Sequence, residues 1–256
     1  MTGRTRFLIG LGAVLAGVSA WALLRPLGLV SPDLLASPAE VWAAFTEILR
    51  DGYRGTTLAE NIGATLGRCL AGFMLATLLG VPLGLWLGMS RLADASVNFI
   101  IQFLRPLPPL SYLVLLILWF GAGDLSKIML LFMGAFPTIT TASMAGVRQV
   151  SRQRVQVART LGASGLQIFR FVVLPGALSM IFTGLSIALA GAFSSVVAAE
   201  LMAASNGLGW MIFSASRFLR NDIILLGIIL LGVFGMALTW SLALVDRRVV
   251  HWRGRD

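Results

Sequence analysis

The stretch from Gln156 to Pro175, QVARTLGASGLQIFRFVVLP, decides how this chain is interpreted, because it is polar and lies between two apolar spans. It is also basic, since no acidic residue occurs between Arg148 and Pro175. A basic segment of this kind between membrane spans is either a docking surface for another protein or simply a cytoplasmic loop.

Local signals within the stretch predict two short helices separated by a break. Gly162 stops the first helix, and Ser164 with Gln167 forms a capping box that starts the second one. Leu174 and Pro175 are expected to restart the chain into the next span, because proline is tolerated in the first turn of a helix. The first helix has an apolar face at helical spacing, made of Val155, Ala158 and Leu161.

The composition is that of an integral membrane protein. Of the 256 residues, 57% are hydrophobic and only 12% are charged, whereas about 25% of a soluble domain is charged. The mean hydropathy is +0.88. The net charge of +9 does not indicate a nucleic-acid partner, because the basic residues lie at the ends of apolar spans, facing a lipid bilayer. We therefore expect a single membrane domain over residues 1–256.

Apolar runs predict an all-α polytopic fold with six transmembrane helices. The first run could instead be a signal peptide, but it is longer than the usual apolar core of one. Three prolines between Arg105 and Pro109 should break the third span, and Pro137 should kink the fourth. The predicted spans are Phe7–Leu24, Leu70–Met89, Val97–Phe120, Ile128–Val147, Leu178–Ala204 and Ile223–Val245.

The distribution of arginine predicts the orientation of these spans. With both termini and the loop 148–175 in the cytoplasm, twelve arginines lie inside and six Lys or Arg residues lie outside. Positive charge in short loops favours the cytoplasmic side. We therefore expect a multi-pass membrane protein with both termini in the cytoplasm.

The segments between the spans carry further signals. Ser37 and Glu40 form a capping box for an amphipathic helix that Gly52 ends, within the polar stretch Ser31–Thr65. This helix is expected to lie on the membrane surface, or to pack on neighbouring spans. The stretch from Ser205 to Asp222 is expected to be a polar re-entry.

Small residues recur every fourth position in the second span, which lets another helix approach closely. The partner is another helix of the same chain or a second copy of it. The positions are Gly72, Ala76, Gly80, Gly84 and Gly88.

Four polar residues in or near the spans are candidates for the transport pathway or its gate. Glu200 is either a gate residue or the partner of a polar group on a neighbouring span, since a carboxylate within a span is costly. Arg105 either attracts an anion or lies near the cytoplasmic face, paired with Asp94 or lipid phosphate. The other two candidates are Ser194 and Ser195.

Several kinds of chemistry are excluded. The only lysine, Lys127, is followed by Ile128 and has no glycine pattern before it, so the chain has no P-loop. The single histidine, His251, lies in the tail, which excludes an intramembrane protease. Cys69 is the only cysteine and can form neither an intrachain disulfide nor a cysteine metal cluster. We expect no catalytic residue, no metal and no enzyme activity in this chain.

The loop resembles the EAA loop of ABC-importer permeases, whose pattern is Glu-Ala-Ala, three residues, Gly, nine residues and Ile-x-Leu-Pro. The spacing matches in full from Gly162 to Pro175, with Val172 in the Ile position. At the start, Gln156 replaces the family's Glu and Val157 replaces its first Ala, while Ala158 fits. Gln156 therefore lacks the carboxylate with which the family's Glu forms an ion pair with the ATPase. The resemblance implies a coupling helix pair that seats on a separate ATPase through Gln156, Ala158, Arg159, Leu161, Gly162, Ala163, Ser164, Leu174 and Pro175.

The resemblance extends over roughly residues 66–222 to permeases for nitrate, sulfonates and taurine. It is carried by Arg105–Pro109, Trp119–Gly123, Leu174–Ala177, Ala198–Leu201 and Gly207–Gly209. It implies a type I importer permease that works as a homodimer with two ATPases, which bind ATP and Mg, and with an external substrate-binding protein. Taurine or another alkanesulfonate is the implied solute, and nitrate, bicarbonate and pyrimidine-precursor importers share the scaffold. The alternative is a self-sufficient secondary transporter or channel.

Overall fold

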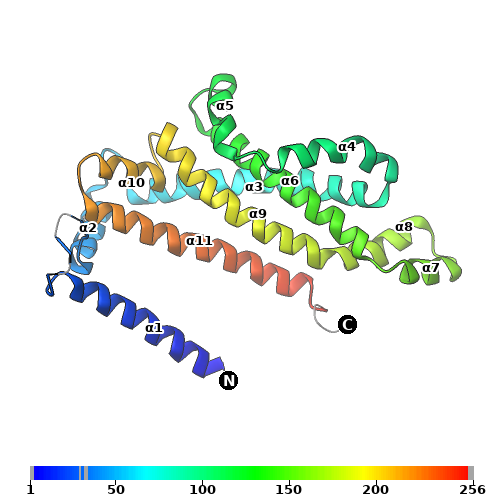
Figure 1. Cartoon of the computed structure of the whole chain (residues 1–256), viewed down its shortest axis with the longest axis horizontal. Coiled ribbons are helices and arrows are strands. Elements are labelled where there is room, and N and C mark those ends of the chain that lie inside the picture. The colour runs from blue at the N-terminus through cyan, green and yellow to red at the C-terminus, as the bar shows by residue number, and fades with distance from the viewer. Residues whose placement is uncertain (1–2, 29, 32–33, 253–256) are drawn as a thin grey trace.

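The computed structural model describes residues 3–28, 30–31 and 34–252, and every regular element among them is a helix. Long helices run alongside one another, and shorter helices cover both ends (Figure 1). This arrangement confirms the predicted all-α fold. The four long helices are α3 (Leu58–Met89), α6 (Asp124–Gln149), α9 (Leu174–Ala203) and α11 (Asn221–Val249).

These four helices are long and apolar enough to cross a membrane, and a fifth span forms if a bent pair is counted as one. The pair consists of α4 (Arg91–Leu104) and the segment Pro109–Phe120, which meet at 91°. The segment joins η1 (Pro109–Tyr112) to α5 (Leu113–Phe120). The bend lies at the predicted proline break, where proline removes backbone donors.

The first predicted span forms α1 (Gly3–Leu24), which stands apart from the long helices in Figure 1. Within the described residues only its part Leu15–Leu24 counts as an apolar helix, and that part is shorter than a span. Six transmembrane helices therefore stay a prediction.

The helix α3 begins at Leu58, well before the predicted start of the second span. A second capping box starts it: Thr57 N donates to Glu60 Oε2 at 2.8 Å, and Glu60 N donates to the Thr57 hydroxyl at 3.2 Å. Since this box lies inside a polar stretch, the hydropathy pattern places the start too late.

The amphipathic helix α2 (Pro38–Asp51) starts and ends as predicted. Ser37 N donates to Glu40 Oε2 at 2.8 Å, and Gly52 closes the helix with a φ of 73°. Its buried face packs on α10 and α11, as one of the two predictions has it. A position at the membrane surface is compatible with this packing and stays a prediction. That face consists of Val41, Ala44 and Ile48.

The stretch predicted as a polar re-entry folds into α10 (Leu208–Ser216), whose apolar side is buried against α2 and α11. Arg220, just before α11, donates to Glu47 Oε2 and to Asp222 Oδ2, each at 2.8 Å. Hydrogen bonds to the Asp222 and Glu47 carboxylates raise the pKa of Arg220. These ion pairs fasten α2 to the start of α11.

The small-residue face of α3 packs on α6 of the same chain. A Cβ at Gly72 would lie 2.5 Å from Leu131 Cβ, and a Cβ at Gly88 would lie 2.6 Å from Val147 Cβ. Two Cβ atoms do not come this close in real structures. The two backbones can therefore approach each other only because glycine has no Cβ. Of the two predicted partners, the helix within the same chain is the observed one.

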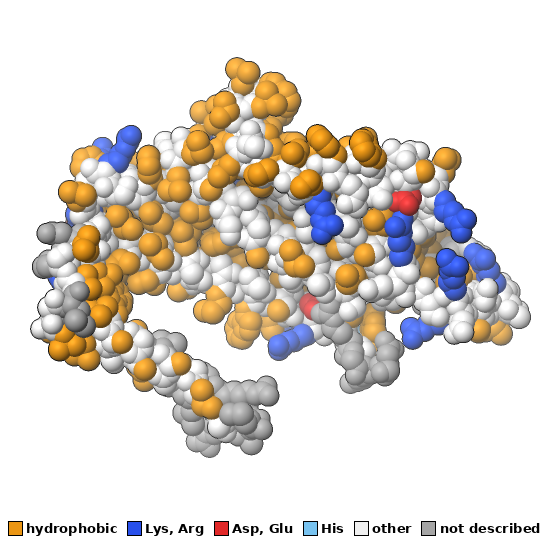
Figure 2. Space-filling view, in the orientation of Figure 1, with side chains coloured by type: hydrophobic (Ala, Val, Ile, Leu, Met, Phe, Trp, Pro, Cys, Tyr) orange, Lys and Arg blue, Asp and Glu red, His pale blue; other side chains and the backbone are white. Residues whose placement is uncertain are grey.

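The polar and apolar surfaces are separated. Hydrophobic side chains cover the middle of the molecule, and Lys and Arg side chains gather at the end where α7 and α8 lie (Figure 2). The C-terminal end of α11 lies at this same end, whereas α2 and α10 lie at the opposite end (Figure 1).

Candidate functional site

The basic loop forms a helix pair whose break is closed at Gly162. The first helix, α7 (Arg152–Thr160), is followed by Gly162 with a φ of 81°. Gly162 N donates to Arg159 O at 2.9 Å, and Ala163 N donates to Ala158 O at 3.0 Å. These two bonds and the left-handed glycine form a Schellman motif, which confirms the predicted helix stop.

The second helix, α8 (Gly165–Ile168), begins with the predicted capping box. Ser164 N donates to Gln167 Oε1 at 2.7 Å, and Gln167 N donates to the Ser164 hydroxyl at 3.4 Å. The capping box and the Schellman motif together fix the angle between α7 and α8.

As predicted, α9 begins at Leu174 with Pro175 in its first turn, but the chain enters it without a break. A π-helical segment, η2 (Phe169–Val173), joins α8 to α9, and Leu174 N donates to Phe169 O. Proline lacks an N–H and its ring collides with the carbonyl four residues before it. Widening the helix just before Pro175 accommodates the ring, so 39 residues from Gly165 to Ala203 form one continuous span.

The predicted coupling residues lie together on this helix pair. Gln156, Arg159, Leu161, Gly162 and Ser164 are exposed. The more apolar Ala158, Ala163, Leu174 and Pro175 are half-buried.

The helix pair also exposes large apolar side chains. Leu161 is 82% exposed, Leu166 is 75% exposed and Phe171 is 69% exposed. The sequence identifies Leu166 only as an apolar residue, and the observed fold shows that it is uncovered. Exposed apolar patches of this kind are typical of interaction surfaces.

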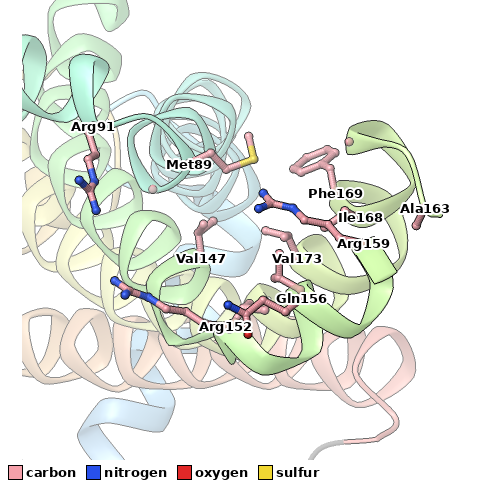
Figure 3. Close-up of a pocket in the computed structure, with 14 residues that line it drawn as sticks. Met89, Arg91, Val147, Arg152, Gln156, Arg159, Ala163, Ile168, Phe169 and Val173 are labelled. Atoms are coloured by element: carbon pink, nitrogen blue, oxygen red, sulfur yellow. The ribbon is translucent and has the colours of Figure 1, made fainter. Parts of the chain in front are cut away.

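A cleft of about 670 Å³ lies between the helix pair and the ends of α3 and α6. Figure 3 shows the Arg159 side chain reaching from α7 toward Met89 and Phe169, and Gln156 nearer to Arg152. No carboxylate is among its lining residues. The three basic residues that line it are Arg91, Arg152 and Arg159.

The expected pair of Arg105 with Asp94 is not formed. Arg148 Nη2 donates to Asp94 Oδ2 at 2.7 Å, which ties α4 to the end of α6. Arg105 is exposed at the end of α4. The charge that interacts with Asp94 therefore comes from the last turn of α6 and not from the proline break.

Glu200 is fully buried and lies in a cluster of polar groups, named here the Glu200 cluster. Arg68 Nη1 donates to Glu200 Oε1 at 2.7 Å, the Thr65 hydroxyl donates at 2.9 Å, and Gly209 N donates to Oε2 at 2.9 Å. Of the two alternatives predicted for Glu200, the pairing with a neighbouring span is present. A role for Glu200 as a gate stays a prediction.

Arg68 links the cluster to two further segments. Its Nη2 lies 2.7 Å from Asp124 Oδ1 at the start of α6, and its Nη1 donates to Asn206 O at 3.0 Å. Arg68 is not among the predicted site residues, although an arginine this far inside an apolar helix needs a partner.

The glycine at position 207 makes room for this arrangement. A Cβ there would collide with the Glu200 carboxylate, and the φ of Gly207 is 118°. Gly207 N donates to Asn61 Oδ1 at 2.8 Å, and Leu208 N donates to the Thr65 hydroxyl at 2.8 Å. The turn before α10 is therefore fastened to α3.

The remaining pathway candidates lie on α9. Ser194 is exposed and Ser195 is half-buried, and their hydroxyls donate to Ala190 O at 3.1 Å and to Gly191 O at 2.8 Å. Among the described residues no three His, Cys, Asp or Glu side chains gather as a metal site.

Comparisons with known proteins agree with this geometry. The family described as "Binding-protein-dependent transport system inner membrane component" matches residues 80–251. The taurine transport system permease protein TauC of Escherichia coli is 37% identical, over 96% of this chain and 90% of its own length. A putative aliphatic sulfonates transport permease protein of Bacillus subtilis, SsuC, is 32% identical, over 98% of this chain and 90% of its own length.

The fold also matches a solved importer. The MetNI methionine ABC transporter in an inward-facing conformation aligns with a TM-score of 0.66 at 21% identity, over 75% of this chain and 95% of that one. This chain therefore belongs to the family of binding-protein-dependent transport system inner membrane components, in its nitrate, sulfonate and taurine branch.

Proposed function

We propose that residues 1–256 form one permease domain of an ATP-driven importer, and that a separate ATPase drives it through the helix pair α7–α8. The observation that carries this proposal is the exposed basic and apolar face of that pair, held at a fixed angle by Gly162 and Ser164. Two permease copies, two ATPases that bind ATP and Mg, and an external binding protein make up the assembly. ATP hydrolysis belongs to the ATPase, and this chain needs no cofactor.

The cleft beside the helix pair suggests what takes over the role of the glutamate that the family has at the position of Gln156. Arg91, Arg152 and Arg159 line it and no carboxylate does, while Gln156 is uncharged. Complementary charge across an interface favours the correct partner. The ATPase therefore presents an acidic side chain to this cleft, and the ion pair has its charges reversed with respect to the family's arrangement.

Taurine or another alkanesulfonate is the proposed solute, because the relatives named for taurine and for aliphatic sulfonates cover nearly the whole chain. Nitrate, bicarbonate and pyrimidine precursors are the alternatives within the same scaffold. Ligand binding by the secreted binding protein that copurifies with this chain identifies the solute.

The orientation follows from the same proposal, with both termini and the helix pair in the cytoplasm. Cysteines introduced at Leu49 and at Ser151 should react with a membrane-impermeant maleimide from opposite sides, because α2 and α7 lie at opposite ends of the bundle. Cys69 is buried and gives little background. Labelling of both positions from one side would contradict the orientation.

The test of coupling is the substitution Gly162→Val. A β-branched residue is strongly disfavoured at a φ of 81°, so the angle between α7 and α8 should change. The spans should still insert, since insertion depends on their apolar length. We expect normal amounts of permease, weakened ATPase association in a pull-down, and no uptake in membranes of matched permease content.

The matched control is Gly165→Val, three residues further on. Gly165 is also open to solvent, and its backbone lies within a helix. It should therefore keep most uptake. Full uptake by Gly162→Val would contradict the coupling role. Uptake without any ATPase would point to a self-sufficient carrier.

A further inference from the structure

A second cleft, of about 420 Å³, lies at the end of the bundle opposite the helix pair, and we name it the outer pocket. It is formed by the end of α9, by α10 and by the turn between α2 and α3. Its lining includes two arginines and three aromatic rings, and no carboxylate. These five residues are Arg54, Trp210, Phe213, Arg217 and Phe218.

Each arginine is positioned by a ring. The Arg54 guanidinium carbon lies 4.4 Å from the centre of the Phe218 ring, and that of Arg217 lies 5.1 Å from the centre of the Phe213 ring. Neither arginine forms an ion pair with any described residue. A guanidinium stacked on a ring still directs N–H donors outward from its edge, in a geometry that suits an oxyanion.

The backbone around the outer pocket is strained at two positions. Arg54 has a φ of 51°, and Leu219, next to Phe218, has a φ of 55°. Arg54 and Gly55 form a tight turn closed by Tyr53 N donating to Thr56 O at 2.7 Å and by the reverse bond at 3.1 Å. Such turns favour Asn-Gly, so an arginine in the first position is unfavourable locally. Strain of this kind persists where function requires the side chain.

The outer pocket adjoins one face of α9, and this face includes the pathway candidate Ser194. Ser194, Ala198, Leu201 and Met202 are spaced as neighbours on one side of a helix, and Ser194 and Met202 are exposed. Met202 lines the outer pocket, and Ser194 lies roughly 12 Å further along the helix axis. An anion that leaves the outer pocket therefore meets this face of α9 next.

We propose that the outer pocket receives the small sulfonate solute from outside, with Arg54 and Arg217 binding its sulfonate oxygens and the rings contacting its alkyl part. The proposal rests on the proposed function for the class of solute. It adds an entry site at the outer end of the bundle. A carboxylate of the docked binding protein offers similar chemistry, and the test below separates the two sources.

The direct test measures how fast phenylglyoxal modifies individual arginines of the full-length permease in lipid nanodiscs, by mass spectrometry of peptides. Ethanesulfonate at about twice its Kd should slow modification of Arg54 and Arg217 about threefold, because only the unoccupied fraction reacts. Arg50 is exposed on α2 outside the outer pocket and serves as the control within each sample. Neutral dimethyl sulfone should protect none of the three.

Equal modification rates with and without ethanesulfonate would overturn the proposal. So would equal protection of Arg50, which would indicate a general salt effect. A third arm adds the binding protein without sulfonate. Protection of Arg54 and Arg217 in this arm, together with no protection by ethanesulfonate alone, would show that the two arginines contact the binding protein, and would overturn the proposal. Because this assay does not measure transport, a negative result would overturn the proposal for the outer pocket without contradicting the coupling role of the helix pair.

The second measurement is uptake of radiolabelled taurine by the complete importer. Arg54→Gln and Arg217→Gln should each lower maximal uptake about tenfold, in the range expected for loss of a charged hydrogen bond. The concentration of binding protein that gives half-maximal uptake should not change, and Arg50→Gln should behave as the parent. An increase in that concentration at unchanged maximal uptake would contradict the proposal.

Discussion

Replacing Arg68 with methionine should lower the free energy of unfolding of the permease by about 3 to 5 kcal/mol, because it leaves the buried Glu200 carboxylate without its cation. Glu200 is 0% exposed, so water cannot take the place of the lost guanidinium. The same substitution removes the bonds that hold Asn206. Thermal unfolding of the purified protein in detergent measures the effect.

Two further variants distinguish the effect of breaking the buried pair of Arg68 and Glu200 from the effect of removing any charged group. Asp124, the other carboxylate that Arg68 contacts, is 64% exposed. The substitution Asp124→Asn should therefore lower the free energy of unfolding by less than about 1 kcal/mol. The double variant Arg68→Met with Glu200→Met should be more stable than Arg68→Met alone, because no uncompensated charge remains. Equal unfolding temperatures for Arg68→Met and Asp124→Asn would show that the Glu200 cluster does not stabilise the fold.

Replacing Gly84 with leucine should separate α3 from α6 and cost about 3 kcal/mol, the upper part of the range for overpacking. A Cβ at this position would lie 2.6 Å from Ser143 Cβ and would collide with the backbone oxygen of Thr140. Backbone atoms cannot rotate away, so the helices themselves must move. Thermal unfolding and the yield of folded protein measure the result.

The control is Gly67→Leu on the same helix, where an added Cβ meets nothing within 4 Å. It should leave stability unchanged or raise it, since leucine favours a helix more than glycine does. Gly80→Leu should be intermediate, because its nearest contacts are side-chain atoms at 3.2 Å. If Gly84→Leu unfolds at the temperature of Gly67→Leu, the close approach of α3 and α6 is not needed for stability.

Features set by neighbouring residues could be predicted from the sequence. The helix stop at Gly162 and the capping boxes at Ser37 and Ser164 involve residues at most a few positions apart, so the sequence contains both partners. The spacing of small residues in α3 likewise predicts a close helix contact. It does not tell which helix makes it, because the partner atoms belong to α6.

Features that depend on distant residues could not be predicted. Glu200 and Arg68 are 132 positions apart, and no spacing rule connects them. The unbroken entry into α9 could not be predicted for another reason: it depends on a local backbone hydrogen bond between residues five positions apart, from Leu174 N to Phe169 O, for which the sequence has no recognised pattern. Uncovered side chains such as Leu166 depend on which neighbours pack nearby, and hydropathy gives only the type of residue.

The continuous helix from α8 to α9 has a mechanical consequence. Between Gln167 in the helix pair and Glu200 at the far end it extends roughly 50 Å, so a tilt of about 5° would displace the far end by roughly 4 Å. This displacement is larger than the 2.7 Å distance between Arg68 Nη1 and Glu200 Oε1, so it would break that bond if Arg68 stayed in place. To keep this bond during such a tilt, the ends of α3, α6 and α9 around Glu200 and the turn before α10 would have to move together, and the helix would act as the lever that turns them.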